Sequence, residues 1–159
     1  MGVTDDEVAS HYPCDDIVPV PVLQAWRGVT VRCTPEGLWP WVGQIRLAPY
    51  SYDCIDNLGR RSPQERRALP EPAVGQHFST AATRRLGRIL SVSPAEQLTG
   101  RIAGAVISYV LVSNGDVTRL LMKVVTATGR WLAPLISVGD LVMARRQLLN
   151  LKGLAESNA

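Results

Sequence analysis

The sequence has few of the residues that build metal sites and disulfide frameworks. Its three cysteines, Cys14, Cys33 and Cys54, are odd in number and widely spaced, and its two histidines, His11 and His77, lie far apart. These spacings match no zinc motif and no disulfide framework. Since no serine stands in a nucleophile-elbow context either, triad and metal hydrolysis are both unsupported. We therefore expect no metal and no cofactor, and a lone His77 is expected to be structural.

Long apolar runs and basic–aromatic patterns are also absent. No stretch approaches the ~20 apolar residues of a membrane span. The first twenty residues are acidic and contain proline, unlike a secretory signal, so a reducing cytoplasm is the expected compartment. The arginines are scattered or lie in short pairs without interleaved aromatics, so nucleic acid is not an expected partner. With 159 residues, 46% of them apolar, the chain has the composition of a single globular domain.

Proline and glycine divide the first half of the chain. Residues 1–22, with Pro13, Pro19 and Pro21, are expected to form an extended acidic arm before a single domain over 23–159. Residues 26–33 alternate as a strand. Thr34-Pro35-Glu36 then predicts a capped helix to about Ile45, which Pro40 should shift or split. A second short helix is expected over 50–58, ended by Gly59, followed by an exposed loop over 60–75.

The second half of the chain reads as antiparallel sheet and one long helix. Strands are expected at 76–82, 85–92, 96–102, 104–113 and 116–127, with turns at 93–96 and at Asn114-Gly115. In the last strand Leu120, Met122 and Val124 should face inward, and Arg119 and Lys123 should share the other face. Residues 131–155 predict a helix whose apolar stripe comprises Leu135, Val138, Leu141, Val142, Leu148, Leu149 and Ala155.

An aromatic and acidic run between the two halves carries the most specific signal. It reads Trp39-Pro40-Trp41, then Tyr50-Ser51-Tyr52-Asp53, Ile55-Asp56-Asn57 and Gly59-Arg60. With the order of elements and the final helix, it resembles the SRPBCC (START-like) superfamily over about residues 11–155. It is most similar to a bacterial group often labelled polyketide cyclase or dehydrase. Cys54 stands where that motif usually has tryptophan. The resemblance implies an α+β helix-grip fold, in which a curved antiparallel sheet of about six strands surrounds a long C-terminal helix, with two short helices after the first strand.

The same run supplies the candidate site residues. Asp53 with Tyr52 is the candidate acid–base pair, and a phenol beside a carbonyl is suited to aldol-type cyclisation. The candidate ligand-binding residues are Trp39, Tyr50, Tyr52, Cys54, Tyr109, Met122 and Leu141. Each also has a structural interpretation: Asp53 can cap backbone amides, the tyrosines and tryptophans can be core residues, and Arg101 is expected to face solvent.

Three functions follow from these residues. The leading hypothesis is a small soluble protein that binds a hydrophobic small molecule, lipid-like or polyketide-like, in a cavity between sheet and C-terminal helix. The second is a cofactor-free cyclase or dehydratase that uses Asp53 and neighbouring tyrosines. The third is a non-catalytic interaction protein whose core is filled by its own side chains.

Overall fold

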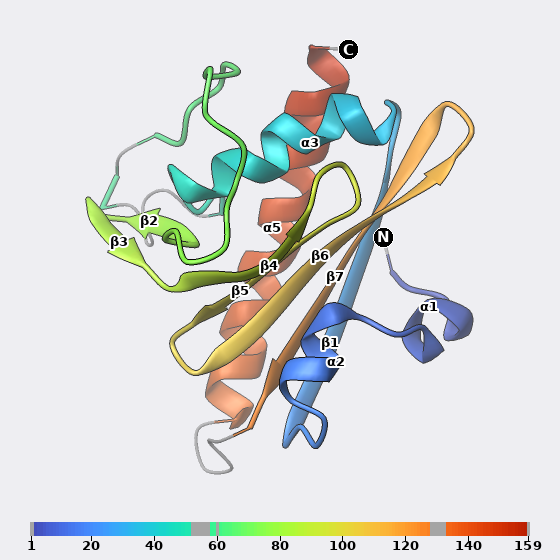
Figure 1. Ribbon diagram of the computed structural model, residues 1–159, viewed down its shortest axis with the longest axis vertical. Coiled ribbons are helices and arrows are strands. Elements are labelled where there is room, and N and C mark those ends of the chain that lie inside the picture. The colour runs from blue at the N-terminus through green and yellow to red at the C-terminus, as the bar shows by residue number, and fades with distance from the viewer. Residues whose placement is uncertain (1, 52–57, 60, 128–132, 159) are drawn as a thin grey trace.

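The protein is built as a sheet covered on both faces (Figure 1). The computed structural model describes residues 2–51, 58–59, 61–127 and 133–158, with residues 133–142 described by their backbone alone. The described residues form a five-stranded antiparallel sheet in the order β1-β7-β6-β5-β4. The long helix α5 (Ala133–Ser157) crosses one face of it, and the N-terminal segment lies on the other. This arrangement confirms the predicted α+β class and the long C-terminal helix.

The strands follow the expected order, and short turns connect most of them. The five-stranded sheet contains β1 (Leu23–Val31), β4 (Arg88–Ser93), β5 (Gln97–Ile102), β6 (Ala105–Asn114) and β7 (Val117–Thr126). The turn after β4 places Ala95 at φ 59°, and the turn after β6 places Gly115 at φ 64°. The expected strand over 76–82 is shorter, because β2 (Ser79–Ala81) pairs with β3 (Arg84–Leu86) in a separate two-stranded sheet.

The main core lies between α5 and one face of the sheet. Leu120 and Met122 of β7 are buried there, as their alternation predicts. They pack in a cluster that also includes Trp41, Leu148 and Leu151. The apolar stripe of α5 is confirmed at Leu148 and Ala155, whereas Leu149 is 38% exposed and belongs to the outer side of the helix.

The opposite face of the sheet corrects two expectations. Lys123 was expected on a polar outer face, but it is buried, because the N-terminal segment covers that face. The covering cluster consists of Tyr12, Cys14, Val18, Val106, Leu121 and Val125. The segment is not extended as expected: it contains the short helices α1 (Asp5–Ala9) and α2 (Pro13–Ile17). Pro13 occupies the first turn of α2, where proline needs no backbone hydrogen bond and favours a helix start.

Helix α3 closes one end of the sheet, as its capping signal predicts. It runs Pro35–Gly43, with the Thr34 hydroxyl accepting a hydrogen bond from the amide of Gly37, and continues as the 3-10 turn η1 (Gln44–Arg46). Pro40 is accommodated inside α3, and the helix gives way to the tighter turn after Gly43. The second helix expected over 50–58 falls mainly on residues 52–57, which lie outside the described residues.

Candidate functional site

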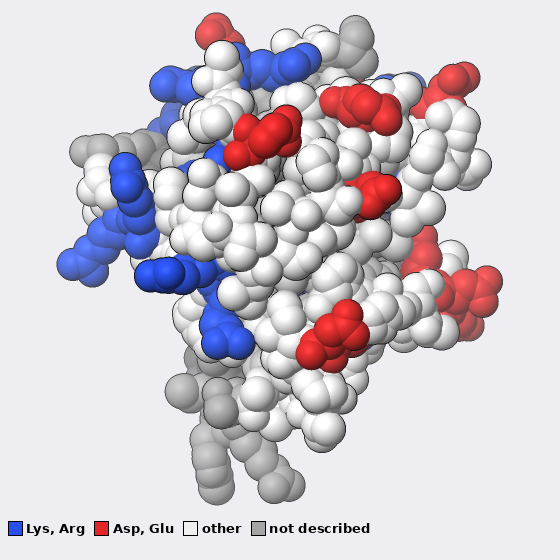
Figure 2. Space-filling model, in the orientation of Figure 1, with Lys and Arg blue, Asp and Glu red and all other residues white. Residues whose placement is uncertain are grey.

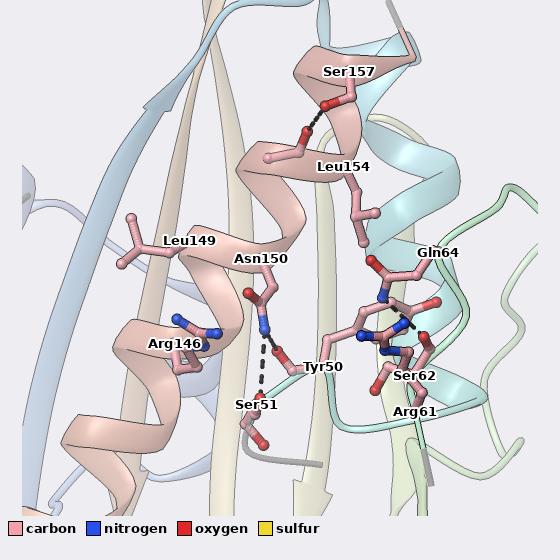
Figure 3. Close-up of a pocket in the computed structure, with 11 residues that line it drawn as sticks. Tyr50, Ser51, Arg61, Ser62, Gln64, Arg146, Leu149, Asn150, Leu154 and Ser157 are labelled. Atoms are coloured by element: carbon pink, nitrogen blue, oxygen red, sulfur yellow. Dashed lines mark hydrogen bonds between the residues drawn. The ribbon is translucent and has the colours of Figure 1, made fainter.

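A cavity of about 670 Å³ lies between the C-terminal half of α5 and the segment that follows η1 (Figure 3). Five of the lining residues lie between positions 50 and 64, and the other six lie along α5. They are Tyr50, Ser51, Arg61, Ser62, Gln64, Arg146, Leu149, Asn150, Gly153, Leu154 and Ser157. Two parts of the chain that are about a hundred residues apart in sequence therefore build one concave surface.

Two amide side chains of α5 form hydrogen bonds to residues 49–51, the segment at one side of the cavity. The Nδ2 group of Asn150 donates to the carbonyl oxygen of Tyr50 at 2.8 Å and to that of Ser51 at 3.4 Å (Figure 3). One turn earlier, the Nε2 group of Gln147 donates to the carbonyl oxygen of Pro49 at 2.6 Å. These bonds satisfy carbonyl groups of a segment without regular structure and fix that segment against the helix.

Tyr50 lines the cavity and is held in place by Gln44, which is not a lining residue. Tyr50 is 1% exposed and has a φ of 53°, a backbone conformation that a tyrosine adopts only when its surroundings hold it. Its hydroxyl accepts a hydrogen bond from Nε2 of Gln44 at 2.8 Å. The carboxamide oxygen of Gln44 accepts from the backbone amide of Arg67. One buried amide thus joins the tyrosine to the loop on the far side of the cavity.

The lining of the cavity is mostly polar. It presents the hydroxyls of Ser51, Ser62 and Ser157, and the guanidinium groups of Arg61 and Arg146. Leu154 points from α5 toward Gln64 and supplies an apolar face (Figure 3). Gly153 leaves open space, because a Cβ built on it would have no atom within 4 Å. The arrangement suits an organic molecule that has an apolar face and several hydrogen-bonding groups.

The ligand-binding residues predicted from the sequence lie in two different parts of the structure. Tyr50 lines this cavity, whereas Trp39, Tyr109 and Met122 are 2–5% exposed and belong to the main core. The indole Nε1 of Trp39 donates to Oε2 of Glu71 at 2.8 Å. The hydroxyl of Tyr109 donates to Oε1 of Gln147 at 2.5 Å, and burial raises the pKa of this phenol. Tyr109 therefore links the core to the helix amide that also holds Pro49.

The remaining candidates divide into two groups. Tyr52, Asp53 and Cys54 lie outside the described residues, as does the side chain of Leu141. Arg101 is exposed on β5, and Nε2 of His77 donates to the backbone carbonyl of Arg46 at 3.1 Å, so both have the expected structural positions.

Sequence reasoning missed Gln44, Gln147 and Asn150. Uncharged amides carry no chemical motif of their own. The available signal was the spacing of Gln147 and Asn150, three residues apart on a helix and hence on one side of it.

Several solved bacterial proteins have the same arrangement of sheet and helix. A Rhodobacter sphaeroides protein is 19% identical over 84% of this chain and 93% of that one, with a TM-score of 0.58. A Mesorhizobium loti protein is 17% identical over 86% and 99%, with a TM-score of 0.55. An AHSA1-like protein from Aeromonas hydrophila is 15% identical over 86% and 94%, with a TM-score of 0.53. The chain has the helix-grip fold. The fold that the sequence resemblance implied is thus confirmed.

At these identities the likeness shows the fold alone. No family model matches the sequence, and the comparison with curated proteins gives no match. In the described part of the chain, no helix has the length and apolar character needed to cross a membrane. Nor do the described residues bring together three or more metal-ligating side chains.

Proposed function

We propose that the protein binds a small polyoxygenated organic molecule, polyketide-like in chemistry, in the cavity between α5 and residues 50–64. The observation that supports this is the lining: hydroxyl, amide and guanidinium groups surround one apolar face at Leu154. A volume of about 670 Å³ suits a ligand of two to three fused or linked rings, since small-molecule sites span ~300–1,000 Å³.

The polar lining favours this class over a lipid. A fatty acyl chain forms no hydrogen bonds along its length, so it would displace water from the polar atoms of the lining and offer no hydrogen bonds in return. Carbonyl and phenol groups on a ring system offer them. The core positions of Trp39, Tyr109 and Met122 also remove the large apolar side chains that a lipid site would use.

The experiment is a direct comparison of two ligand classes. Native mass spectrometry of the purified protein tests for a retained molecule, and isothermal titration compares naringenin (a three-ring polyphenol) with palmitate. We expect saturable binding of naringenin and much weaker binding of palmitate. Tighter binding of palmitate, or no binding of naringenin, would contradict the proposal.

A further inference from the structure

A second hollow lies on the other side of η1, away from the α5 cavity. It has a volume of about 520 Å³. Its lining residues are Arg46, Leu47, Leu69, Pro70, Gly75, Gln76, His77 and Arg85. These residues include two arginines and a histidine but no aspartate or glutamate. Figure 2 shows basic side chains on the side of the molecule where Figure 1 places β2 and β3, and also along the top of the view, while acidic ones are spread over the centre and the opposite side.

Arg46 is the unusual member of this group. It is only 6% exposed, yet its three hydrogen bonds go to neutral oxygens: Nε to Gly43 at 3.0 Å, Nη1 to Gln76 at 2.7 Å and Nη2 to Pro70 at 2.6 Å. No carboxylate of the described residues lies within 4.0 Å of its nitrogens. Buried arginines ordinarily have an anionic partner.

Among the described residues, therefore, no carboxylate in contact with Arg46 compensates its charge. Burial lowers the pKa of the guanidinium, and the more distant charge of Glu71 offsets this only in part. A guanidinium has five N–H donors, and bonds to the described residues occupy three of them.

Arg85 adds donors at the edge of the same hollow. The Nε2–H of His77 donates to the carbonyl oxygen of Arg46, which fixes the imidazole beside that residue. Arg85 is exposed on β3 and lines the hollow, whereas its neighbour Arg84, also exposed, does not. Leu47, Leu69 and Pro70 supply an apolar wall beside these charges. An anionic group next to a small apolar body would complement this surface.

We infer that the hollow between η1, residues 69–77 and β3 binds a small organic phosphate, with Arg46 and Arg85 holding the phosphate group. A phosphate monoester carries a charge of about −1.5 to −2 near neutral pH, which matches two guanidinium groups better than a carboxylate does. This site is separate from the α5 cavity and does not depend on its proposed ligand.

The test uses phenyl phosphate and benzoate as probes in isothermal titrations at low salt. We expect saturable binding of phenyl phosphate, with benzoate at least fivefold weaker. Arg85→Gln should weaken phenyl phosphate at least tenfold, whereas Arg84→Gln, the matched control on the same strand, should change it less than twofold. Gly153→Phe, which places a ring in the α5 cavity, should leave the affinity for phenyl phosphate unchanged.

Three results would overturn the inference. Absence of saturable binding to the wild-type chain removes the site. If Arg85→Gln and Arg84→Gln weaken the affinity for phenyl phosphate equally, the molecule is attracted only by the general positive charge of this side of the protein. Equal affinity for benzoate would refute the preference for phosphate. Because Arg46 also fixes Gly43 and Pro70, its substitution risks the local fold, and the exposed Arg85 therefore decides the outcome.

Discussion

The ammonium nitrogen of Lys123 lies 2.5 Å from Oδ1 of Asp15, across the interface between the sheet and the N-terminal segment. The Lys123 side chain is 5% exposed and lies over the rings of Tyr12 and Trp26, at 5.3 and 5.0 Å from their centroids. Oδ2 of Asp15 also accepts the backbone amide of Tyr12 at 3.0 Å, which caps α2. One carboxylate thus starts the helix and neutralises the buried lysine beneath it.

Loss of the two partners should have unequal effects. Asp15→Asn keeps an oxygen for the cap but leaves the buried ammonium without a counter-charge, so we expect a loss of about 2–3 kcal/mol in unfolding free energy. Lys123→Met removes the charge and keeps the volume, so we expect a change below ~1 kcal/mol. Urea denaturation of both variants measures the difference. Equal losses would mean that the ion pair is not the determinant of this contact.

A second ion pair makes the same interface sensitive to acid. Nε of Arg119 lies 2.7 Å from Oε1 of Glu7, and this hydrogen bond holds the pKa of the Glu7 carboxyl below its ordinary value. A lowered folded-state pKa gives stability that is present above the unfolded pKa of about 4.5 and is lost as the pH falls below it. Glu7→Gln should therefore be less stable than wild type at pH 7 and lose less stability between pH 5 and pH 3.

Thermal melts across that range provide the measurement. Glu156, whose pKa is also lowered, by its hydrogen bond to Lys152, remains in the variant and should keep part of the slope. If Glu7→Gln and wild type show parallel pH profiles, the Arg119 contact does not contribute to the acid response.

The core requires a glycine in β5. A Cβ at Gly100 would lie 2.1 Å from Cδ2 of Phe78, which is 2% exposed and packs 6.2 Å from the ring of Tyr109. Gly100→Ala should displace the Phe78 ring and lower the unfolding free energy by ~1–3 kcal/mol. In a Phe78→Ala background the same substitution should have a much smaller effect.

Gly37→Ala is the matched control, because a Cβ there meets Cys33 Cβ at an ordinary 3.5 Å and alanine favours the helix. Chemical denaturation of the four chains of the cycle gives the coupling energy. Additive losses at Gly100 and Phe78 would rule out the close approach as the cause.

Local patterns were sufficient to predict most of the sheet and the long helix. The alternation along the last strand correctly predicted that Leu120 and Met122 face the core, and Asn114-Gly115 correctly predicted the hairpin turn. Both features depend on neighbouring residues alone. The burial of Lys123 could not be predicted in this way. It depends on a segment more than a hundred residues earlier in the chain, and nothing in the local alternation shows what packs over a sheet.

The cavity was harder to predict than the fold. Tyr50 was identified because aromatic residues suit ligand sites, but the same reasoning included Trp39, Tyr109 and Met122, which fill the core. Large apolar side chains are favoured in both environments, so residue type does not separate them. Asn150 and Gln147 acquire their roles only when α5 meets residues 49–51.

The acid–base hypothesis makes its own prediction. Tyr52 and Asp53 directly follow Ser51, a lining residue of the α5 cavity. If they catalyse a cyclisation, Asp53→Asn and Tyr52→Phe should leave naringenin affinity within about threefold of wild type and abolish turnover of a linear poly-β-ketone substrate. Undiminished turnover in both variants would remove the acid–base assignment, and loss of binding in both would indicate a structural role.

The most direct test of the central proposal uses Gly153, which lies on α5 at the cavity and has open space around its Cα. Gly153→Ala should stabilise the helix by about 0.8–1 kcal/mol and Gly153→Phe by a smaller amount, because glycine is a poorer helix former than either residue. Only phenylalanine projects a large ring into the cavity. Isothermal titration with naringenin should therefore show affinity within about threefold of wild type for Gly153→Ala and at least a tenfold loss for Gly153→Phe. Equal, wild-type affinity in both folded variants would contradict binding at this cavity.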